Sequence, residues 1–470
     1  MTTHNDRYHR QALIKGWDQE KLQDVSIAIL GSDALAQFSA LSLVSLGIGG
    51  VFIYDNASLR ERKSCLPLIE PHTSFVESFE SSLARCNPRV RVAGINAPLD
   101  SPLLPFLLGT PSIIIDTTND VAQKRRTRAY ALEKRIPFIN AAANEKRADI
   151  TIAVPDSPIA SLKTFPSYSG MQQDMLASEI MGGIIAEEVR KIIMPLERDE
   201  TPVSQLSYSR ASLSRFHPSE EETVRSVSLS EKHAFVIGAG ALSNFATLGL
   251  ALSGVGTITI LDFDRIESTN LNRQPLLYEA VGEYKSLTLA ERLQRINGKI
   301  RIRGLVGKLD ETCENYFKKN KPDVLFDCVD NMATRAITNY YAVRYGISLV
   351  SGGTSHTAGQ VAVYMPGKSA CLQCKLGVEK ALAEARTSHS CVQAPQPSVV
   401  MTNQIIGGCM AVEGCSVLAP NAYGESLRKT LKYDSRAPAR VALYGNDAAC
   451  ACVYPKLSRW MDDVMKRYVV

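Results

Sequence analysis

The chain has 470 residues, of which 45% are apolar and 21% charged, and this predicts a globular protein of two or three domains with a well-buried core. The net charge of +5 is spread along the chain without a basic tail, so it does not indicate nucleic-acid binding. The polar N-terminus lacks the apolar core of a secretory signal, and no run of about 18 apolar residues is present. We therefore expect a cytoplasmic protein that does not span a membrane.

An internal repeat organises the predicted elements. Residues 25–55 read as a strand, a glycine-containing turn, an amphipathic helix and a second strand, and residues 234–262 repeat this order. The two stretches align without a gap from Gly31 and Gly238 onward. Each is a βαβ unit of the dinucleotide-binding type, which predicts a mostly parallel sheet with helices on both faces.

The repeat predicts an α/β fold with two tandem Rossmann-like domains. We expect a first domain over residues 1–196 and a second over residues 231–470. The polar, Ser/Glu-rich stretch 197–230 is expected to connect them.

The glycine turns of the two halves differ in chemistry. The second half reads GAGALSN, in which Gly238 and Gly240 let the backbone approach a phosphate at a helix N-terminus. The first half reads GSDALAQ, with Asp33 opposite Gly240. A carboxylate there would repel a polyphosphate, so we expect only the second half to bind a nucleotide.

A polar stretch follows the second strand of the second copy. It reads DFDRIESTNLNRQ and contains Asp262, Asn270, Arg273 and Gln274, with Lys285 shortly after. The first copy keeps the initial Asp but continues as NASLRERKSCLP, without the amide and arginine cluster. We interpret the second copy as an active half and the first as a degenerate structural partner.

A second acidic strand end separates the halves in the same way. The second half reads VLFDCVDN and the first SIIIDTTND, so that Asp330 aligns with Asn119. An acid at this edge of a parallel sheet is suited to hold Mg²⁺ on a nucleotide.

Together these motifs resemble the adenylation domain of the ubiquitin-activating enzyme superfamily, whose members include the bacterial enzymes that adenylate the sulfur carriers of molybdopterin and thiamine synthesis. The resemblance covers nearly the whole chain, as two copies. It implies that Asp262 holds the ribose of ATP, that Asn270, Arg273 and Lys285 contact phosphates, and that Asp330 holds Mg²⁺. The implied ATP-binding set is Gly238, Gly240, Asp262, Asn270, Arg273, Gln274, Lys285, Asp330 and Arg10.

The N-terminal stretch RYHRQ also matches. In homodimeric relatives this segment delivers an arginine to the partner's ATP. By resemblance, Arg10 of the degenerate half would complete the active half's site within a single-chain pseudo-dimer and act with Arg273 and Lys285 in catalysis. The alternative is that Arg10 is an exposed surface residue.

The resemblance also implies a zinc site. Relatives bind Zn²⁺ with two CxxC pairs, and here Cys371 and Cys374 form one such pair. The C-terminal pair, Cys450 and Cys452, is a CxC and so departs from the family pattern. Four reduced thiols without a metal are the alternative.

Cys391 is the candidate nucleophile. It precedes a proline-containing linker and a Gly/Ala-rich helix, which resembles the catalytic-cysteine region of the simpler activating enzymes. His389 is a candidate for lowering its pKa. Cys409 and Cys415 lie in the helical run, where we expect them to pack as small apolar groups.

The resemblance implies an enzyme that uses ATP and Mg²⁺ to adenylate a ubiquitin-like protein with a C-terminal Gly-Gly. A thioester on Cys391 and transfer to a conjugating enzyme would follow. A sulfur-carrier adenylyltransferase without thioester transfer is the main alternative. A non-catalytic scaffold and an NAD-dependent oxidoreductase fit the polar motifs less well.

Overall fold

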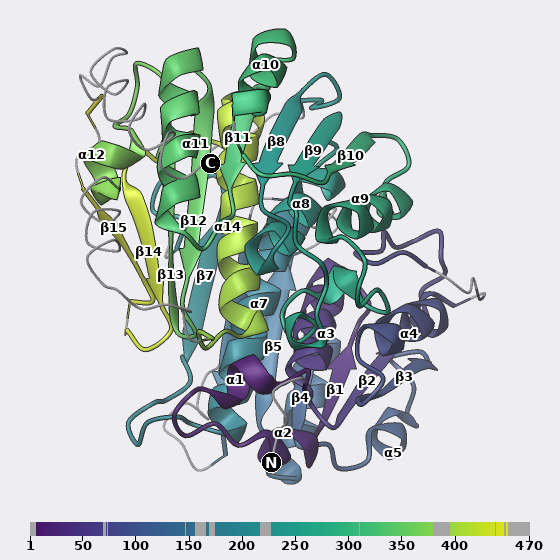
Figure 1. The fold of residues 1–470 in the computed structure, drawn as a ribbon. Helices are drawn as coiled ribbons and strands as arrows, with labels where there is room; N and C mark the ends of the chain where they lie inside the picture. The colour runs from purple at the N-terminus through teal and green to yellow at the C-terminus, as the bar shows by residue number, and fades with distance from the viewer. Residues whose placement is uncertain are drawn as a thin grey trace. The chain divides into compact units, whose positions relative to one another are not determined.

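The computed structural model describes residues 6–68, 72, 74–145, 147–155, 166–168, 174–216, 227–309, 311–378, 395–437, 439–445 and 448–449 (Figure 1). The chain divides into two compact units. The first unit comprises Met1–Glu221, Glu267–Val281 and Pro397–Ile405. The second unit comprises Glu222–Ile266, Gly282–Gln396 and Ile406–Val470.

The described part of the first unit contains a seven-stranded sheet in the order β3-β2-β1-β4-β5-β6-β7. The first five of these strands run parallel, and β6 and β7 are antiparallel to their neighbours. The strands are β1 (Ser26–Leu30), β2 (Gly50–Asp55), β3 (Arg91–Asn96), β4 (Ile113–Asp116), β5 (Phe138–Ala143), β6 (Arg147–Ala153) and β7 (Gln205–Ser209).

Helices connect these strands as the repeat predicts. Helix α3 joins β1 to β2; it begins after Asp33 and ends at Gly47, whose φ of +87° suits glycine. The helices of the first unit are α1 (His9–Ala12), α2 (Gln19–Gln23), α3 (Ala34–Leu46), α4 (Phe75–Cys86), α5 (Leu104–Leu108), α6 (Val121–Glu133) and α7 (Met175–Ile193), with the short turns η2 (Ser268–Asn270) and η3 (Pro275–Leu277).

The described part of the second unit contains an eight-stranded sheet in the order β10-β9-β8-β11-β12-β13-β14-β15. The strands are β8 (His233–Ile237), β9 (Thr257–Leu261), β10 (Arg301–Leu305), β11 (Val324–Asp327), β12 (Ser348–Thr354), β13 (Ala358–Tyr364), β14 (Thr430–Asp434) and β15 (Val441–Tyr444). The helices are α8 (Ala241–Leu252), α9 (Lys285–Ile296), α10 (Glu311–Lys319), α11 (Met332–Tyr345), α12 (Leu372–Leu376), α14 (Val400–Leu418, which begins in the first unit) and α15 (Pro420–Tyr423).

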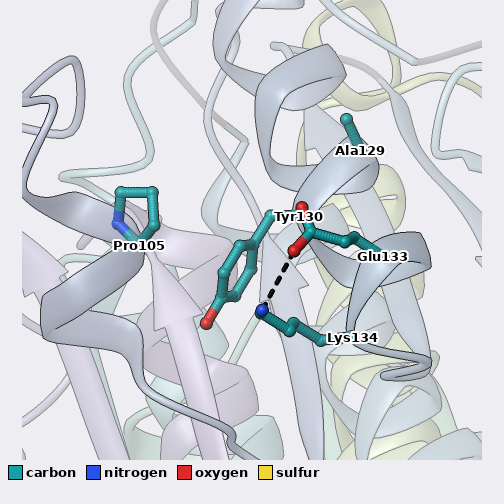
Figure 2. A pocket seen from close by; sticks show the side chains of 5 residues that line it. All are labelled: Pro105, Ala129, Tyr130, Glu133 and Lys134. Atoms are coloured by element: carbon teal, nitrogen blue, oxygen red, sulfur yellow. Dashed lines mark ion pairs between the residues drawn. The ribbon is translucent and has the colours of Figure 1, made fainter.

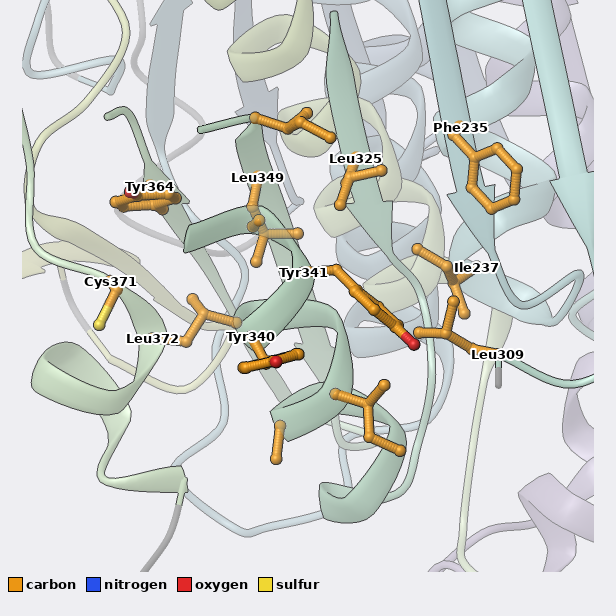
Figure 3. Close-up of a cluster of buried hydrophobic side chains, with 14 of the residues drawn as sticks. Phe235, Ile237, Leu309, Leu325, Tyr340, Tyr341, Leu349, Tyr364, Cys371 and Leu372 are labelled. Carbon is orange, nitrogen blue, oxygen red and sulfur yellow. The ribbon is translucent and has the colours of Figure 1, made fainter. Parts of the chain in front are cut away.

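An aromatic core supports the parallel part of the second sheet. Tyr340 and Tyr341 of α11 pack with Leu325 of β11, Leu349 of β12 and Phe235 of β8 (Figure 3). Because these side chains are almost fully buried, the strand ends that carry the candidate site are held by a packed layer.

The two sheets repeat one strand order, with β15 added in the second. This confirms the predicted α/β fold with two tandem Rossmann-like domains. The structure differs from the predicted connection 197–230 in one respect, because that stretch contributes β7, which pairs antiparallel with β6. Leu206 and Tyr208 of this strand are buried, but two apolar residues within a polar stretch are too few to predict a strand from the sequence. None of the described helices is long and apolar enough to cross a bilayer.

Candidate functional site

The glycine turn of the second unit lies at the carboxyl end of β8, which is flanked by β9 and β11. The strand order reverses at this point, because the chain places β9 and β10 on one side of β8 and β11 on the other. Gly238 has a φ of +93°, and its N–H donates to the Leu261 carbonyl at 2.8 Å. A Cβ on Gly238 would lie 3.0 Å from the Cys328 carbonyl oxygen. The turn therefore needs glycine for its conformation and for its closeness to β11.

The N-terminus of α8 is open. Gly240 is its N-cap residue and supplies no side-chain hydrogen bond to the first-turn N–H groups. A Cβ on Gly240 would meet no atom within 4 Å. Uncapped N–H groups at a helix N-terminus, together with the helix dipole, favour an anion such as a phosphate.

The corresponding helix of the first unit is closed. Asp33 is the N-cap of α3, and its carboxylate accepts from the Ala36 N–H at 2.9 Å. The carboxylate thus takes the place that an anion would occupy at the N-terminus of α3. This geometry supports the predicted difference between the two turns.

Asp262 retains acceptor capacity. Its carboxylate accepts from the backbone N–H groups of Ala239 at 2.6 Å and Asp264 at 2.7 Å. The residue is half-buried, and burial raises the pKa of this carboxyl. A carboxylate offers about four acceptor positions, so the Asp262 group can also accept from the hydroxyls of a ribose.

Asp55, the equivalent acid of the first unit, is saturated. It is 6% exposed and accepts from the Ser32 N–H at 3.0 Å and the Ser32 hydroxyl at 2.6 Å. It also accepts from the backbone N–H groups of Asn56 and Ala57 and pairs with Arg62 at 3.3 Å. The Asp that both copies keep therefore has different chemistry in each.

A hollow of about 360 Å³ remains beside Asp55 in the first unit. Asp33, Asp55 and Glu61 are among its lining residues, together with Asn119, which aligns with Asp330. Arg62 and Lys63 also line this hollow, so its charge is mixed, and Arg62 is already paired with Asp55. A second hollow of the first unit, of about 500 Å³, contains none of the predicted site residues. It lies between α5 and α6 and is lined by Pro105, Ala129, Tyr130, Glu133 and Lys134 (Figure 2).

Lys285 is held next to the Asp262 turn. It is the first residue of α9, it is 9% exposed, and its ammonium pairs with the Asp264 carboxylate at 2.9 Å. Its N–H also donates to the Asp264 carbonyl at 3.0 Å. Sequence reasoning did not single out Asp264, although the second acid of DFD was visible. The half-exposed pair holds the lysine near the strand end while contributing little stability.

The two acids of DCVDN have separate environments. Asp327 is fully buried, accepts from the Ser351 hydroxyl at 2.7 Å and pairs with Arg335 at 3.4 Å. Burial raises the pKa of this carboxyl, and Arg335 opposes the shift. Asp330, three residues after the carboxyl end of β11, is exposed. Its position suits a Mg²⁺ ligand, whereas Asp327 supports the strand end.

The asparagine–arginine–glutamine segment belongs to the first unit. Asn270 is buried, and its Oδ1 accepts from the Glu267 N–H at 3.0 Å, which closes the turn η2. Arg273 is 8% exposed. Gln274 is 4% exposed, and its Oε1 has no hydrogen-bond partner within the described residues. A buried orphan acceptor in this segment fits a donor from a ligand.

Arg10, on α1, lies in this same unit. Its carbonyl accepts from the Ser398 N–H at 3.2 Å, and the Asn272 side chain donates to the Ser398 carbonyl at 3.2 Å. The predicted site residues therefore fall into two groups. The second unit holds Gly238, Gly240, Asp262, Lys285 and Asp330, and the first holds Arg10, Asn270, Arg273 and Gln274.

The predicted cysteine sites are only partly described. Cys371 is buried at the start of α12, and Cys374 is exposed on that helix. Cys391, Cys450 and Cys452 lie outside the described residues. Across the residues that are described, no group of three or more His, Cys, Asp or Glu side chains could hold a metal ion. The zinc site therefore stays a prediction.

Two consecutive α/β halves with the same strand order define a class of proteins built on a repeated Rossmann-like unit. The ThiF family matches residues 8–226 and 208–450, so the chain belongs to the ThiF family. This confirms the resemblance that the sequence motifs carry.

Three curated relatives illustrate the similarity. The Sulfur carrier protein ThiS adenylyltransferase of Bacillus subtilis is 38% identical over 152 residues, covering 32% of this chain and 45% of the relative. The Molybdopterin-synthase adenylyltransferase of Escherichia coli is 33% identical over 213 residues, covering 44% and 80%. The Adenylyltransferase and sulfurtransferase MOCS3 of Anopheles gambiae is 38% identical over 148 residues, covering 31% and 33%.

The chain thus spans less than half the length of the first and third of these relatives. All three are named adenylyltransferases, which agrees with the predicted use of ATP.

Proposed function

We propose that the chain is an ATP-dependent adenylyltransferase for a ubiquitin-like protein with a C-terminal Gly-Gly, and that its second half carries the nucleotide chemistry. One observation carries this proposal. In the second unit, the uncapped N-terminus of α8 and the unsaturated Asp262 occur together. In the first unit, Asp33 caps the equivalent helix, and Ser32 and Arg62 occupy the equivalent carboxylate, Asp55.

In this reaction the terminal carboxylate of the carrier attacks the α-phosphorus of ATP. A new acyl–phosphate bond forms, the bond to the β-phosphate breaks, and pyrophosphate leaves. Asp262 would orient the ribose, while Gly238 and Gly240 would admit the phosphates to the helix N-terminus. Lys285 and Arg273 would offset the charge that develops on the phosphates, and so reduce the barrier.

Four further residues complete the proposed set. Asn270 and Gln274 would orient phosphate oxygens, and Arg10 would add a second guanidinium. Asp330 would hold Mg²⁺, which neutralises phosphate charge when bound. The buried Gln274 Oε1, which has no hydrogen-bond partner within the described residues, would accept from a donor group of the ligand, and the amide nitrogen of Gln274 would be the atom that faces a phosphate oxygen.

The next step of the proposal is thioester formation. The Cys391 thiolate would attack the acyl carbon of the adenylate, and AMP would leave with the bonding electron pair. The acyl group would then pass to a ubiquitin-conjugating-type enzyme. The motif around Cys391 supports this step, and Cys371, Cys374, Cys450 and Cys452 would hold a structural Zn²⁺ nearby in sequence.

A second candidate function ends at the adenylate. The relatives are named for sulfur carriers and molybdopterin synthase, which favours transfer of the activated carrier to a sulfur donor instead of a thioester to a conjugating enzyme. Both candidates share the adenylation step and differ only in the fate of the adenylate.

Incubation with ATP and purified Gly-Gly proteins separates the candidates. We expect carrier-dependent ATP–pyrophosphate exchange and a thiol-sensitive adduct on non-reducing gels. Cys391→Ala should keep the exchange and lose the adduct, while the control Cys415→Ala, at a buried thiol of α14, should keep both. An adduct that persists in Cys391→Ala removes the thioester assignment, and no exchange with any carrier removes the proposed adenylation.

A further inference from the structure

A directed chain of hydrogen bonds ends on Arg273. The Gln11 Nε2 donates to the Leu46 carbonyl at 2.9 Å and to the Gln19 Oε1 at 2.6 Å. The Gln11 Oε1 accepts from the Asn272 Nδ2 at 2.9 Å. The Asn272 Oδ1 in turn accepts from the Arg273 Nη1 at 2.9 Å.

The direction of this chain is fixed at both ends. Leu46 offers a carbonyl, which only accepts, so the amide nitrogen of Gln11 must face it and the amide oxygen must face Asn272. Asn272 also donates to the Ser398 carbonyl at 3.2 Å, which leaves its oxygen for the guanidinium, a group that only donates. A flip of either amide would set donor against donor or acceptor against acceptor.

Both amides are fully buried, at 0% exposure. A broken link would leave a buried polar atom without a hydrogen-bond partner, which is unfavourable. The arrangement is therefore stiff. It fixes one nitrogen of a planar guanidinium, and with it the plane in which the guanidinium can bind an oxyanion.

The side chains that link Gln11 to Arg273 by hydrogen bonds are also uncharged. Arg273 Nη1 is held by the Asn272 amide and, at 2.7 Å, by the Thr269 carbonyl. Neither partner carries a charge, so these contacts orient the guanidinium without cancelling the charge that would attract a phosphate. An acid at position 272 would have the same shape and the opposite effect.

We propose that Gln11 and Asn272 are positioning residues, which hold the Arg273 guanidinium in a phosphate-competent orientation through uncharged hydrogen bonds. This inference rests on the proposed function, in which Arg273 contacts the phosphates of ATP. The inference gives the N-terminal segment a second role besides supplying Arg10, because Gln11 would align Arg273.

The test compares Asn272→Asp, Asn272→Ser and Gln11→Ala in ATP–pyrophosphate exchange. We expect kcat/KM for ATP to fall about 10- to 100-fold, with Asn272→Asp the most affected because its carboxylate pairs with Arg273. In an Arg273→Lys background, Asn272→Ser and Gln11→Ala should have little further effect, because the planar guanidinium that they orient is gone. Should Asn272→Asp fail to fold, Asn272→Ser carries the same test.

Gln37→Ala is the matched control. Gln37 is 1% exposed, donates to the Ser32 and Lys63 carbonyls and accepts from the Cys65 N–H, so its loss tests a buried amide of equal connectivity. It should lower the unfolding temperature as Asn272→Ser does, but leave kcat/KM unchanged.

Two outcomes overturn the inference. The first is a change in kcat/KM within about twofold for all three variants, and the second is an equal loss from Asn272→Ser and Gln11→Ala in the Arg273→Lys background. Absence of exchange in the wild-type chain overturns the proposed function, and the positioning inference with it, so the two failures are distinguishable.

Discussion

Gly240→Asp should convert the open helix of the second unit into a copy of the closed one. Gly240 is the N-cap residue of α8, and its φ of −82° and ψ of −157° are extended values that an aspartate can adopt. A Cβ there would meet no atom within 4 Å. The new carboxylate can therefore cap α8 as Asp33 caps α3, by accepting from a first-turn N–H.

Stability and nucleotide affinity should move in opposite directions. Loss of glycine entropy, together with a carboxylate at the positive end of the helix, should raise the unfolding free energy by about 1 kcal/mol. A like charge about 4 Å from a phosphate costs about 4 kcal/mol at an effective dielectric constant of about 20. Since about 1.4 kcal/mol is a factor of ten, affinity for ATP should fall on the order of 1,000-fold.

The assay pairs chemical denaturation with titration by a non-hydrolysable ATP analogue. Asp33→Gly is the matched control: it should lower stability by up to about 1 kcal/mol and leave ATP affinity unchanged. A stabilised Gly240→Asp protein that binds the analogue with wild-type affinity would refute the phosphate site at α8.

Three further predictions concern single ionisable side chains. Lys285→Met keeps the buried stem but removes the ammonium that pairs with Asp264, so kcat of pyrophosphate exchange should fall about 100-fold; a wild-type kcat would remove Lys285 from the phosphate set. Arg10→Ala should slow exchange at least about tenfold, and an unchanged rate would show that Arg10 does not reach ATP. Glu179 of α7 is fully buried, neither carboxyl oxygen has a hydrogen-bond partner within the described residues, and burial raises its pKa well above the ordinary value. Folding then takes up a proton, so stability falls as pH rises from about 4 to about 7, and Glu179→Gln should flatten this dependence in denaturation curves at the two pH values; equal slopes would contradict the assignment.

The fold was predictable because the same βαβ pattern occurs twice in the chain. The glycine turns, the acids at the strand ends and the tandem arrangement are all local features of sequence. Strand β7 was not predictable from composition, because only Leu206 and Tyr208 mark it within a polar stretch. The segment Glu267–Val281 belongs to the first unit because of its tertiary contacts, and no local sequence pattern predicts such contacts.

The sequence motifs name the candidate site residues but do not reveal the environment of each residue. Both copies keep an aspartate after the second strand, and sequence could not show that Ser32 and Arg62 saturate Asp55. The Gln11–Asn272 contact joins residues 261 positions apart, and amides in a polar segment carry no signal of such pairing. Only the packed structure shows which groups these side chains contact.

Carrier-dependent ATP–pyrophosphate exchange by the pair Asp262→Asn and Asp55→Asn tests the central claim most directly. The account predicts that Asp262→Asn loses exchange, while Asp55→Asn, if folded as judged by its unfolding transition, retains it. Exchange that survives Asp262→Asn and disappears in a folded Asp55→Asn protein would contradict the assignment of the second half as the active one.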